Sequence, residues 1–149
     1  MHRILVREIM SAPAVTIGPE QLAVDAAELM EEFSIRRLPV VNDDNVLLGI
    51  VTDTDVLEAE TAEHVINSYE PDVEAEWLAV ADIMSDEVVA VGPDCTVGEL
   101  ASIFIQHKVG GVPVVESLAN KKQVVGIVTE TDIFQMIVDA WQAEQQQSA

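Results

Sequence analysis

The pattern of apolar and polar positions predicts a defined series of elements in the first half of the chain. Short runs rich in Val and Ile favour strands, and apolar residues that recur every three or four positions are typical of amphipathic helices. This pattern predicts strands at residues 14–17, 38–41 and 46–51, a helix at 21–33, and a second helix from about Val56.

The second half of the chain repeats this order of strand, helix, strand, strand, helix. It predicts strands at 88–91 and 112–115, a helix at 95–107 and a last helix from about Thr131. The turn of the second hairpin is three residues longer, which predicts a longer surface loop there. We therefore expect an α/β (α+β) fold of two pseudo-symmetric β-α-β-β-α repeats, packed sheet to sheet because about 55 residues per repeat is marginal for independent stability.

The strongest internal similarity is a seven-residue segment that the chain contains twice. Residues 49–55, Gly-Ile-Val-Thr-Asp-Thr-Asp, recur at 126–132 as Gly-Ile-Val-Thr-Glu-Thr-Asp. The β-branched residues favour a buried strand, and Thr and Asp cap helix starts. Each copy therefore predicts a strand that leads directly into a helix.

The repeats and the segment between them give the expected domain boundaries. We expect repeat 1 at residues 1–68, an acidic connector at 69–79, and repeat 2 with the C-terminal helix at 80–149. The helix that follows Thr52 is expected to extend as far as Ser68. The tail from Glu144 onward is expected to fray.

Composition and charge limit the classes of partner and location. The chain lacks a segment of about 20 apolar residues that could span a bilayer, and its N-terminus is not expected to act as a signal peptide. Its single cysteine, Cys95, forms no internal disulfide. We therefore expect a soluble cytoplasmic protein. The formal charge of −20 repels phosphate backbones and anionic lipids, so neither nucleic acid nor a membrane is expected as a partner. His64 and His107 lack partners at metal-ligand spacing, so no metal is expected.

The few basic residues are unevenly placed. Between Arg7 and Lys108 the only Lys or Arg residues are Arg36 and Arg37. Their two guanidiniums could pair with nearby carboxylates such as Glu31 or Glu32, which would contribute about 0–1 kcal/mol. Alternatively, they could bind an anionic ligand.

The chain resembles a tandem pair of CBS domains, also called a Bateman module, over nearly its whole length. Three duplicated motifs carry this resemblance: Ile-Met-Ser at 9–11 and 83–85, x-Pro-Val-Val at 38–41 and 112–115, and the Gly-Ile-Val-Thr-x-Thr-Asp segment at 49–55 and 126–132. The resemblance implies that adenosine-containing ligands bind in clefts between the repeats. The ligands in question are AMP, ADP, ATP or S-adenosylmethionine, acting as regulatory ligands with no cofactor required.

The resemblance also implies roles for particular residues. The ribose and phosphate would be bound by Thr52, Thr54, Asp55, Thr129, Thr131 and Asp132. Phosphate contacts would come from Arg36, Arg37 and Lys108, and the adenine pocket would be lined by Thr16, Ile17, Ile35, Ala90, Val109 and Gly111. The second repeat has Gly110 and Gly111 where the first has the arginines, so the two clefts are not expected to be equivalent, and either arginine could serve either cleft.

Two functions of different classes follow from these observations. The first is a non-catalytic regulatory module that binds an adenosine-containing ligand and signals to a separate, unknown effector protein. The alternative is a structural dimerisation module with degenerate, ligand-free clefts. An enzyme is not expected, because no nucleophile–base pair, metal cluster or phosphate-binding Gly-rich loop is recognisable. In either case we expect a homodimer, with Phe134, Ile137 and Trp141 of the last helix as a possible face.

Overall fold

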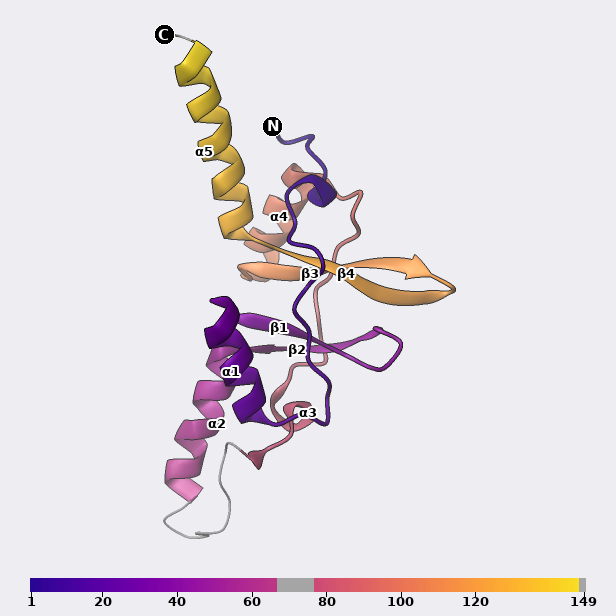
Figure 1. Ribbon diagram of the computed structural model, residues 1–149, viewed down its shortest axis with the longest axis vertical. Helices are drawn as coiled ribbons and strands as arrows, with labels where there is room; N and C mark the ends of the chain where they lie inside the picture. The colour runs from indigo at the N-terminus through magenta and orange to yellow at the C-terminus, as the bar shows by residue number, and fades with distance from the viewer. Residues whose placement is uncertain (67–76, 148–149) are drawn as a thin grey trace. The chain divides into compact units, whose positions relative to one another are not determined.

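The computed structural model describes residues 1–66 and 77–147, with the side chains of 61–66 excepted. It has the expected mixed α/β class, with two separate two-stranded antiparallel sheets, β1–β2 and β3–β4 (Figure 1). The elements in chain order are the 3₁₀ turn η1 (Val6–Glu8), α1 (Ala23–Phe33), β1 (Arg37–Val41), β2 (Leu47–Thr52), α2 (Asp53–Ile66), α3 (Val80–Ile83), α4 (Val97–His107), β3 (Gly111–Leu118), β4 (Lys121–Thr129) and α5 (Glu130–Gln147).

The chain folds into two compact units that interleave in sequence. Unit 1 consists of Met1–Ala14 and Val89–Ala149, and unit 2 consists of Val15–Val88. The segment that opens each sequence repeat thus belongs to the unit that contains the sheet of the other repeat. The boundaries expected at 1–68, 69–79 and 80–149 remain a prediction about the sequence repeats, and the helix end at Ser68 and most of the connector lie outside the described residues.

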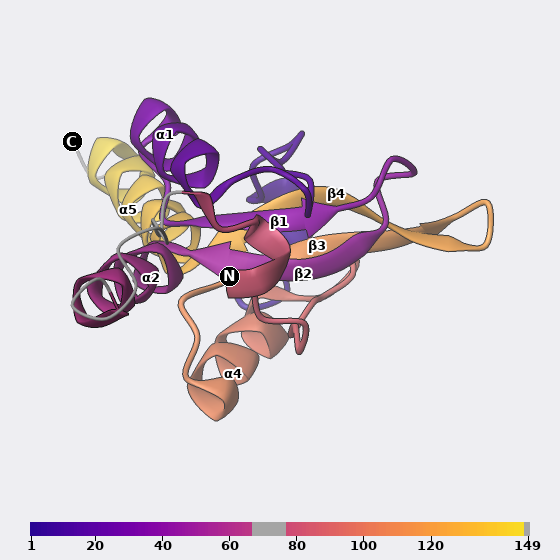
Figure 2. The ribbon, with the colours of Figure 1, turned by 90° about the horizontal axis from the view of Figure 1, so that it is seen from below.

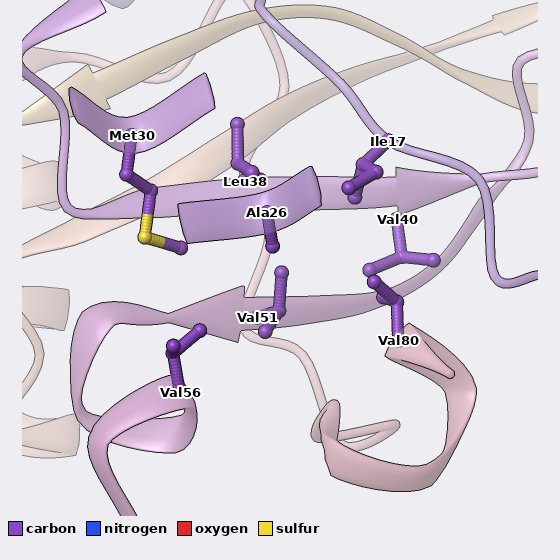
Figure 3. Packing of buried hydrophobic residues seen from close by; sticks show 8 residues of the cluster. All are labelled: Ile17, Ala26, Met30, Leu38, Val40, Val51, Val56 and Val80. Carbon is purple, nitrogen blue, oxygen red and sulfur yellow. The ribbon is translucent and has the colours of Figure 1, made fainter. Parts of the chain in front are cut away.

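Unit 2 is built on the hairpin β1–β2. In its register Leu38 lies opposite Val51, and both side chains are fully buried. Figure 2 shows α1 and α2 at the same end of this hairpin. Apolar side chains from the strands, the helices and α3 form one core, as expected for small aliphatic residues on the inner faces of amphipathic elements; they are Ile17, Ala26, Met30, Leu38, Val40, Val51, Val56 and Val80 (Figure 3).

Unit 1 repeats this arrangement on the hairpin β3–β4. Val112 lies opposite Val128, in the place that Leu38 and Val51 occupy in unit 2. Its core combines residues of η1, α4 and both strands, namely Val6, Val91, Leu100, Phe104, Val112, Val114 and Val128. The helix predicted from residue 95 begins at Val97, because Thr96 is its cap: Thr96 Oγ1 accepts a hydrogen bond from Glu99 N at 3.2 Å.

Each hairpin is extended by the Met-Ser segment that opens the other repeat. Ser85 exchanges two backbone hydrogen bonds of 2.9 Å with Ile50 of β2, and Ser11 exchanges two of 2.9 and 3.0 Å with Ile127 of β4. This close contact explains why each strand has a glycine beside the bridge. A Cβ on Gly49 would lie 2.7 Å from both Met84 Sδ and Ser85 O, and a Cβ on Gly126 would lie 2.7 Å from Met10 Sδ. Only glycine permits so close an approach.

The strands expected at 14–17 and 88–91 do not form as strands. Each makes a single parallel bridge, Ile17 with Val40 and Val91 with Val114. Ile17 N donates to Pro39 O at 3.1 Å, and Val41 N donates to Ile17 O at 2.9 Å. The next bond of a parallel ladder would need an N–H on Pro39, which proline lacks. Pro113 prevents the bridge between Val91 and Val114 from extending in the same way.

The prediction of a longer loop in the second hairpin is also wrong. The additional residues lengthen β3 and β4 to 8 and 9 residues. The turn itself is only Ala119 and Asn120, whose φ angles of 52° and 65° are both positive. Two positive φ angles define the type I′ turn that fits the twist of a hairpin.

Two helix boundaries differ from the prediction. The helix expected near Val56 begins at Asp53, because Thr52 serves as its cap. The tail expected to fray from Glu144 instead continues α5 to Gln147, since Gln and Glu have favourable helix propensity.

We expect Gly49→Ala and Gly126→Ala to destabilise the fold by about 1–3 kcal/mol each, because the added methyl group overpacks a site closed by a backbone carbonyl. Urea denaturation measures this loss. Gly92→Ala is the matched control, since a Cβ there would meet no atom closer than Val115 O at 3.9 Å. Equal stability of all three variants would show that the close approach is not a constraint.

Cys95 precedes α4 and is expected to react slowly as a thiol. Burial raises the pKa of the Cys95 thiol, and the nearby Glu99 carboxylate raises it further. The reactive thiolate is therefore scarcer than in a free cysteine at the same pH. Alkylation by iodoacetamide at pH 8 should be slower in the folded protein than in urea, and equal rates in the two conditions would contradict this.

Candidate functional site

The junction of β2 and α2 is a reciprocal helix cap. Thr52, the last residue of β2, donates its backbone N–H to Asp55 Oδ2 at 2.8 Å, and its Oγ1 accepts the N–H of Asp55 at 3.2 Å. Two of the N–H groups that a helix start leaves without partners are satisfied in this way. The cap fixes the Asp55 carboxylate at the N-terminus of α2.

The junction of β4 and α5 in unit 1 has nearly the same geometry. Thr129 N donates to Asp132 Oδ2 at 2.8 Å, and the Thr129 hydroxyl donates to the same oxygen at 3.3 Å. The helix α5 begins directly after, at Glu130. The duplicated sequence therefore produces a duplicated local structure, one copy in each unit.

Both carboxylates retain capacity to bind another group. In each case the capping bonds use Oδ2, and within the described residues no hydrogen bond to Oδ1 of Asp55 or Asp132 is formed. Both aspartates are half-buried, whereas Thr54 and Thr131 beside them are exposed. A half-buried carboxylate oxygen beside a helix N-terminus can accept hydroxyl donors, while the helix N–H groups favour an anion.

The segments that lead into β1 and β3 lie against these junctions. Arg36 O accepts the N–H of Asp53 at 2.9 Å, and Gly110 O accepts the N–H of Glu130 at 3.0 Å. One residue later, Arg37 is paired with Thr52 in the β1–β2 register. The structure thus brings both arginines together with the Thr52–Asp55 segment, within unit 2.

Comparison of the helix ends that precede β1 and β3 shows which residue of unit 2 corresponds to Lys108. The helix α1 ends at Ser34 and α4 ends at Lys108, both in the left-handed conformation with φ of 54°. Lys108 therefore corresponds to Ser34, and Gly110 corresponds to Arg36. Lys108 is exposed and lies two residues before the position that the arginine pattern would occupy.

The two arginines differ in their surroundings. Arg36 is exposed, and in the described part of the chain its side chain makes no ion pair with Glu31 or Glu32. Arg37 is half-buried and interacts with a neighbouring group. The pairing that would make these residues purely structural is therefore not seen for Arg36.

The residues expected to line an adenine pocket divide equally between the units. Thr16, Ile17 and Ile35 belong to unit 2, and Ala90, Val109 and Gly111 to unit 1. Ile17 is only 2% exposed and its backbone bonds are used by β1, so it has little left to offer a ligand. The others, apart from the buried Gly111, are half-buried, and their role stays a prediction.

Sequence reasoning missed the backbone carbonyls of Arg36 and Gly110. These two groups hold the first helical residue in place at each junction. Every residue carries such a carbonyl, so no side-chain pattern could have indicated them.

The described residues show neither a cluster of metal ligands nor a membrane-spanning helix. Among them, no group of three or more His, Cys, Asp or Glu side chains is placed to hold a metal ion. The helices of this described part are also too short or too polar to cross a membrane.

These duplicated junctions, hairpins and Met-Ser bridges define a pair of repeated α/β units. The CBS-domain family profile matches residues 6–62 and 80–139, and the chain belongs to this family as a tandem CBS-domain pair.

Known relatives share this organisation. A CBS domain-containing protein of Dictyostelium discoideum is 31% identical over 137 residues, which cover 91% of this chain and 92% of the relative. A crystal structure of AcuB from Vibrio cholerae, a protein assigned to acetoin utilization, is 28% identical and superposes with a TM-score of 0.79 over 96% of each chain. The CBS-domain pair of protein MJ0100, solved in complex with 5′-methylthioadenosine and S-adenosyl-L-methionine, is 28% identical with a TM-score of 0.75 over 91% of this chain and 97% of that one.

Proposed function

We propose that this CBS-domain pair is a non-catalytic regulatory module that binds an adenosine-containing ligand at its strand–helix junctions and signals to a separate effector protein. The ligand is AMP, ADP, ATP or S-adenosylmethionine, and no further cofactor takes part. The observation that carries the proposal is the capped aspartate at each junction, which keeps Oδ1 available beside a helix N-terminus. The related pair of MJ0100, which was solved with two adenosine compounds, supports this choice of ligand.

The chemistry of the junction suits a ribose. A carboxylate is an acceptor-only group, and a ribose presents two vicinal hydroxyl donors. Hydrogen bonds to a charged acceptor are about twice as strong as neutral ones. The Thr54 and Thr131 hydroxyls, exposed at the first turn of each helix, add donors for ribose or phosphate.

The remaining parts of the proposal follow from the family and the charge. The stand-alone CBS-domain relatives of this chain are regulatory rather than catalytic, which supports a role in regulation. The charge of −20 disfavours nucleic acids and anionic membranes as effectors, so the effector is a protein. A cytoplasmic location fits these ligands, which are cytoplasmic metabolites.

A ligand screen tests the proposal directly. AMP, ADP, ATP, S-adenosylmethionine and NAD are each titrated by calorimetry and by thermal shift. A ligand present at a hundredfold its dissociation constant should stabilise the folded state by about 2.7 kcal/mol. Failure of every adenosine compound to bind would favour the structural alternative.

We expect Asp55→Asn and Asp132→Asn to weaken binding of adenosine ligands about tenfold or more at the affected junction, because a charge-assisted bond contributes about 1.5–3 kcal/mol. Asparagine keeps an oxygen for the cap, so the fold is retained. Calorimetry measures the affinity of each variant. A 2′,3′-dideoxy ligand should bind the wild type and both variants equally.

Asp25→Asn is the matched control for this experiment. Asp25 Oδ2 accepts the N–H of Leu22 at 2.9 Å, the same capping bond at the start of α1, but no duplicated junction lies there. This variant should show the stability cost of losing a capping charge and no loss of affinity. Unchanged affinity in Asp55→Asn, Asp132→Asn and their double variant would remove the aspartates from the site.

We also propose that the protein is a homodimer, and α5 provides the supporting observation. None of its residues is buried, and Phe134, Ile137, Val138 and Trp141 are 61%, 42%, 40% and 56% exposed along one stripe. A stripe of this kind on a long helix is typical of an interface. A dimer built on it would bury at least about 1,000 Å².

We expect light scattering at high micromolar concentration and about 0.3 M salt, which screens the like charges of the two copies, to give the mass of a dimer. Phe134→Glu and Trp141→Glu should convert it to a monomer, because each buries a charge in the interface. Ile105→Glu, at a 78% exposed position of α4 in the same unit, is the control. A wild-type monomer under these conditions would rule against the dimer.

The structural dimerisation module remains the second candidate function, and the exposed α5 stripe is what favours it. Ligand binding distinguishes the two candidates. A dimer that binds no adenosine compound would establish the second candidate.

A further inference from the structure

The two junctions of this chain differ in their local formal charge. At the β2–α2 junction, Arg36 and Arg37 stand against Asp53 and Asp55, so the formal charges of these four residues cancel. At the β4–α5 junction the equivalent positions are Gly110, Gly111, Glu130 and Asp132, with a formal sum of −2. The equivalence is structural, since Arg36 O and Gly110 O accept the same helix-start N–H at 2.9 and 3.0 Å.

We propose that the two junctions divide the ligands by charge. The β2–α2 junction takes an adenosine ligand that carries phosphate, and the β4–α5 junction takes an adenosine compound without phosphate, such as a thioether or sulfonium nucleoside. This inference rests on the proposed function and assigns a ligand class to each junction.

Arg36 is the residue that makes the first junction suitable for phosphate. Its backbone is held at the start of α2 by the bond to Asp53 N, and its side chain is exposed and outside any ion pair with the described residues. A guanidinium binds phosphate oxygens in a bidentate manner. The N-terminus of α2, a helix of 14 residues, favours the same anion.

The second junction has no arginine to offset the negative charge of its carboxylates or of a phosphate. Gly110 and Gly111 contribute no side chain, and the nearest cation in sequence, Lys108, corresponds to Ser34 rather than to an arginine. A phosphate there would meet Glu130 and Asp132 in a chain of charge −20, and like charges repel at such short range. A neutral nucleoside avoids this repulsion, and a sulfonium gains from the two carboxylates.

The related pair of MJ0100 is consistent with this division. Both adenosine compounds in its complex, 5′-methylthioadenosine and S-adenosyl-L-methionine, lack phosphate. A CBS-domain pair similar to this chain can therefore accept nucleosides of the class assigned to the β4–α5 junction.

The test uses AMP and 5′-methylthioadenosine as probes on the full chain. Calorimetry should show AMP binding at one site per chain, and it should show the same affinity when 5′-methylthioadenosine is already saturating. Asp55→Asn should weaken AMP binding about tenfold or more and leave 5′-methylthioadenosine unchanged, and Asp132→Asn should do the reverse. Competition of the two probes for one junction would overturn the division.

Arginine variants test the charge argument separately. Arg36→Ala, and Arg36→Ala with Arg37→Ala, should weaken AMP binding about tenfold or more without affecting 5′-methylthioadenosine. The single variant serves if the double variant does not fold, because Arg36 is exposed. Lys121→Ala with Lys122→Ala, at the tip of the β3–β4 hairpin, is the matched control for the double variant, because it also removes two positive charges. Equal AMP affinity in the arginine and lysine variants would overturn the role of the arginines.

Salt dependence completes the comparison. AMP affinity should fall as NaCl rises from 50 to about 500 mM, because its contact joins unlike charges, and 5′-methylthioadenosine affinity should stay nearly constant. Failure of the inference is distinct from failure of the proposed function. If both probes bind both junctions in a ribose-dependent manner, only the division by charge fails. If neither probe nor any adenosine compound of the ligand screen binds, the proposed function fails as well.

Discussion

The contact between a strand glycine and the Met-Ser segment of the other repeat is the constraint on which both units depend. Without a Cβ at Gly49, β2 lets Met84 and Ser85 approach closely enough for two backbone bonds, and Gly126 does the same for Met10 and Ser11. This approach covers an edge of each two-stranded hairpin, which would be marginally stable alone. It also ties the opening of each repeat to the sheet of the other, so neither repeat can form its compact unit from its own residues.

The same strand that carries the glycine ends in the candidate site. Three residues after Gly49, β2 ends at Thr52, and the cap formed with Asp55 starts α2. The strand is held by the bridge between Ile50 and Ser85, and the helix start is held by the carbonyl of Arg36. Two short backbone constraints therefore fix the position of one carboxylate, and preorganisation of this kind lowers the entropic cost of binding. The residues that stabilise this strand–helix junction are therefore also those of the candidate site.

Much of this arrangement could be predicted from the sequence because it is local. The hairpin strands, the helices and the Thr–Asp caps each depend on residues within a few positions of one another. The exchange of opening segments could not be predicted, because apolar periodicity shows that a segment is buried without showing which partner buries it. The strand predicted at 14–17 does not form for a second reason, since the proline that limits its pairing lies on the neighbouring strand, at Pro39.

The interleaving of the units has a consequence for the order of folding during translation. Unit 2 is continuous, so all of its residues have left the ribosome once residue 88 has emerged. Unit 1 is discontinuous, and Ser11 in the segment Met1–Ala14 cannot pair with Ile127 until β4 has been synthesised. Domains generally fold as units while the chain is made. A chain whose synthesis stops after residue 88 and before β4 would therefore contain all residues of unit 2, together with an N-terminal segment that has no partner. This segment is the part that a chaperone would have to protect.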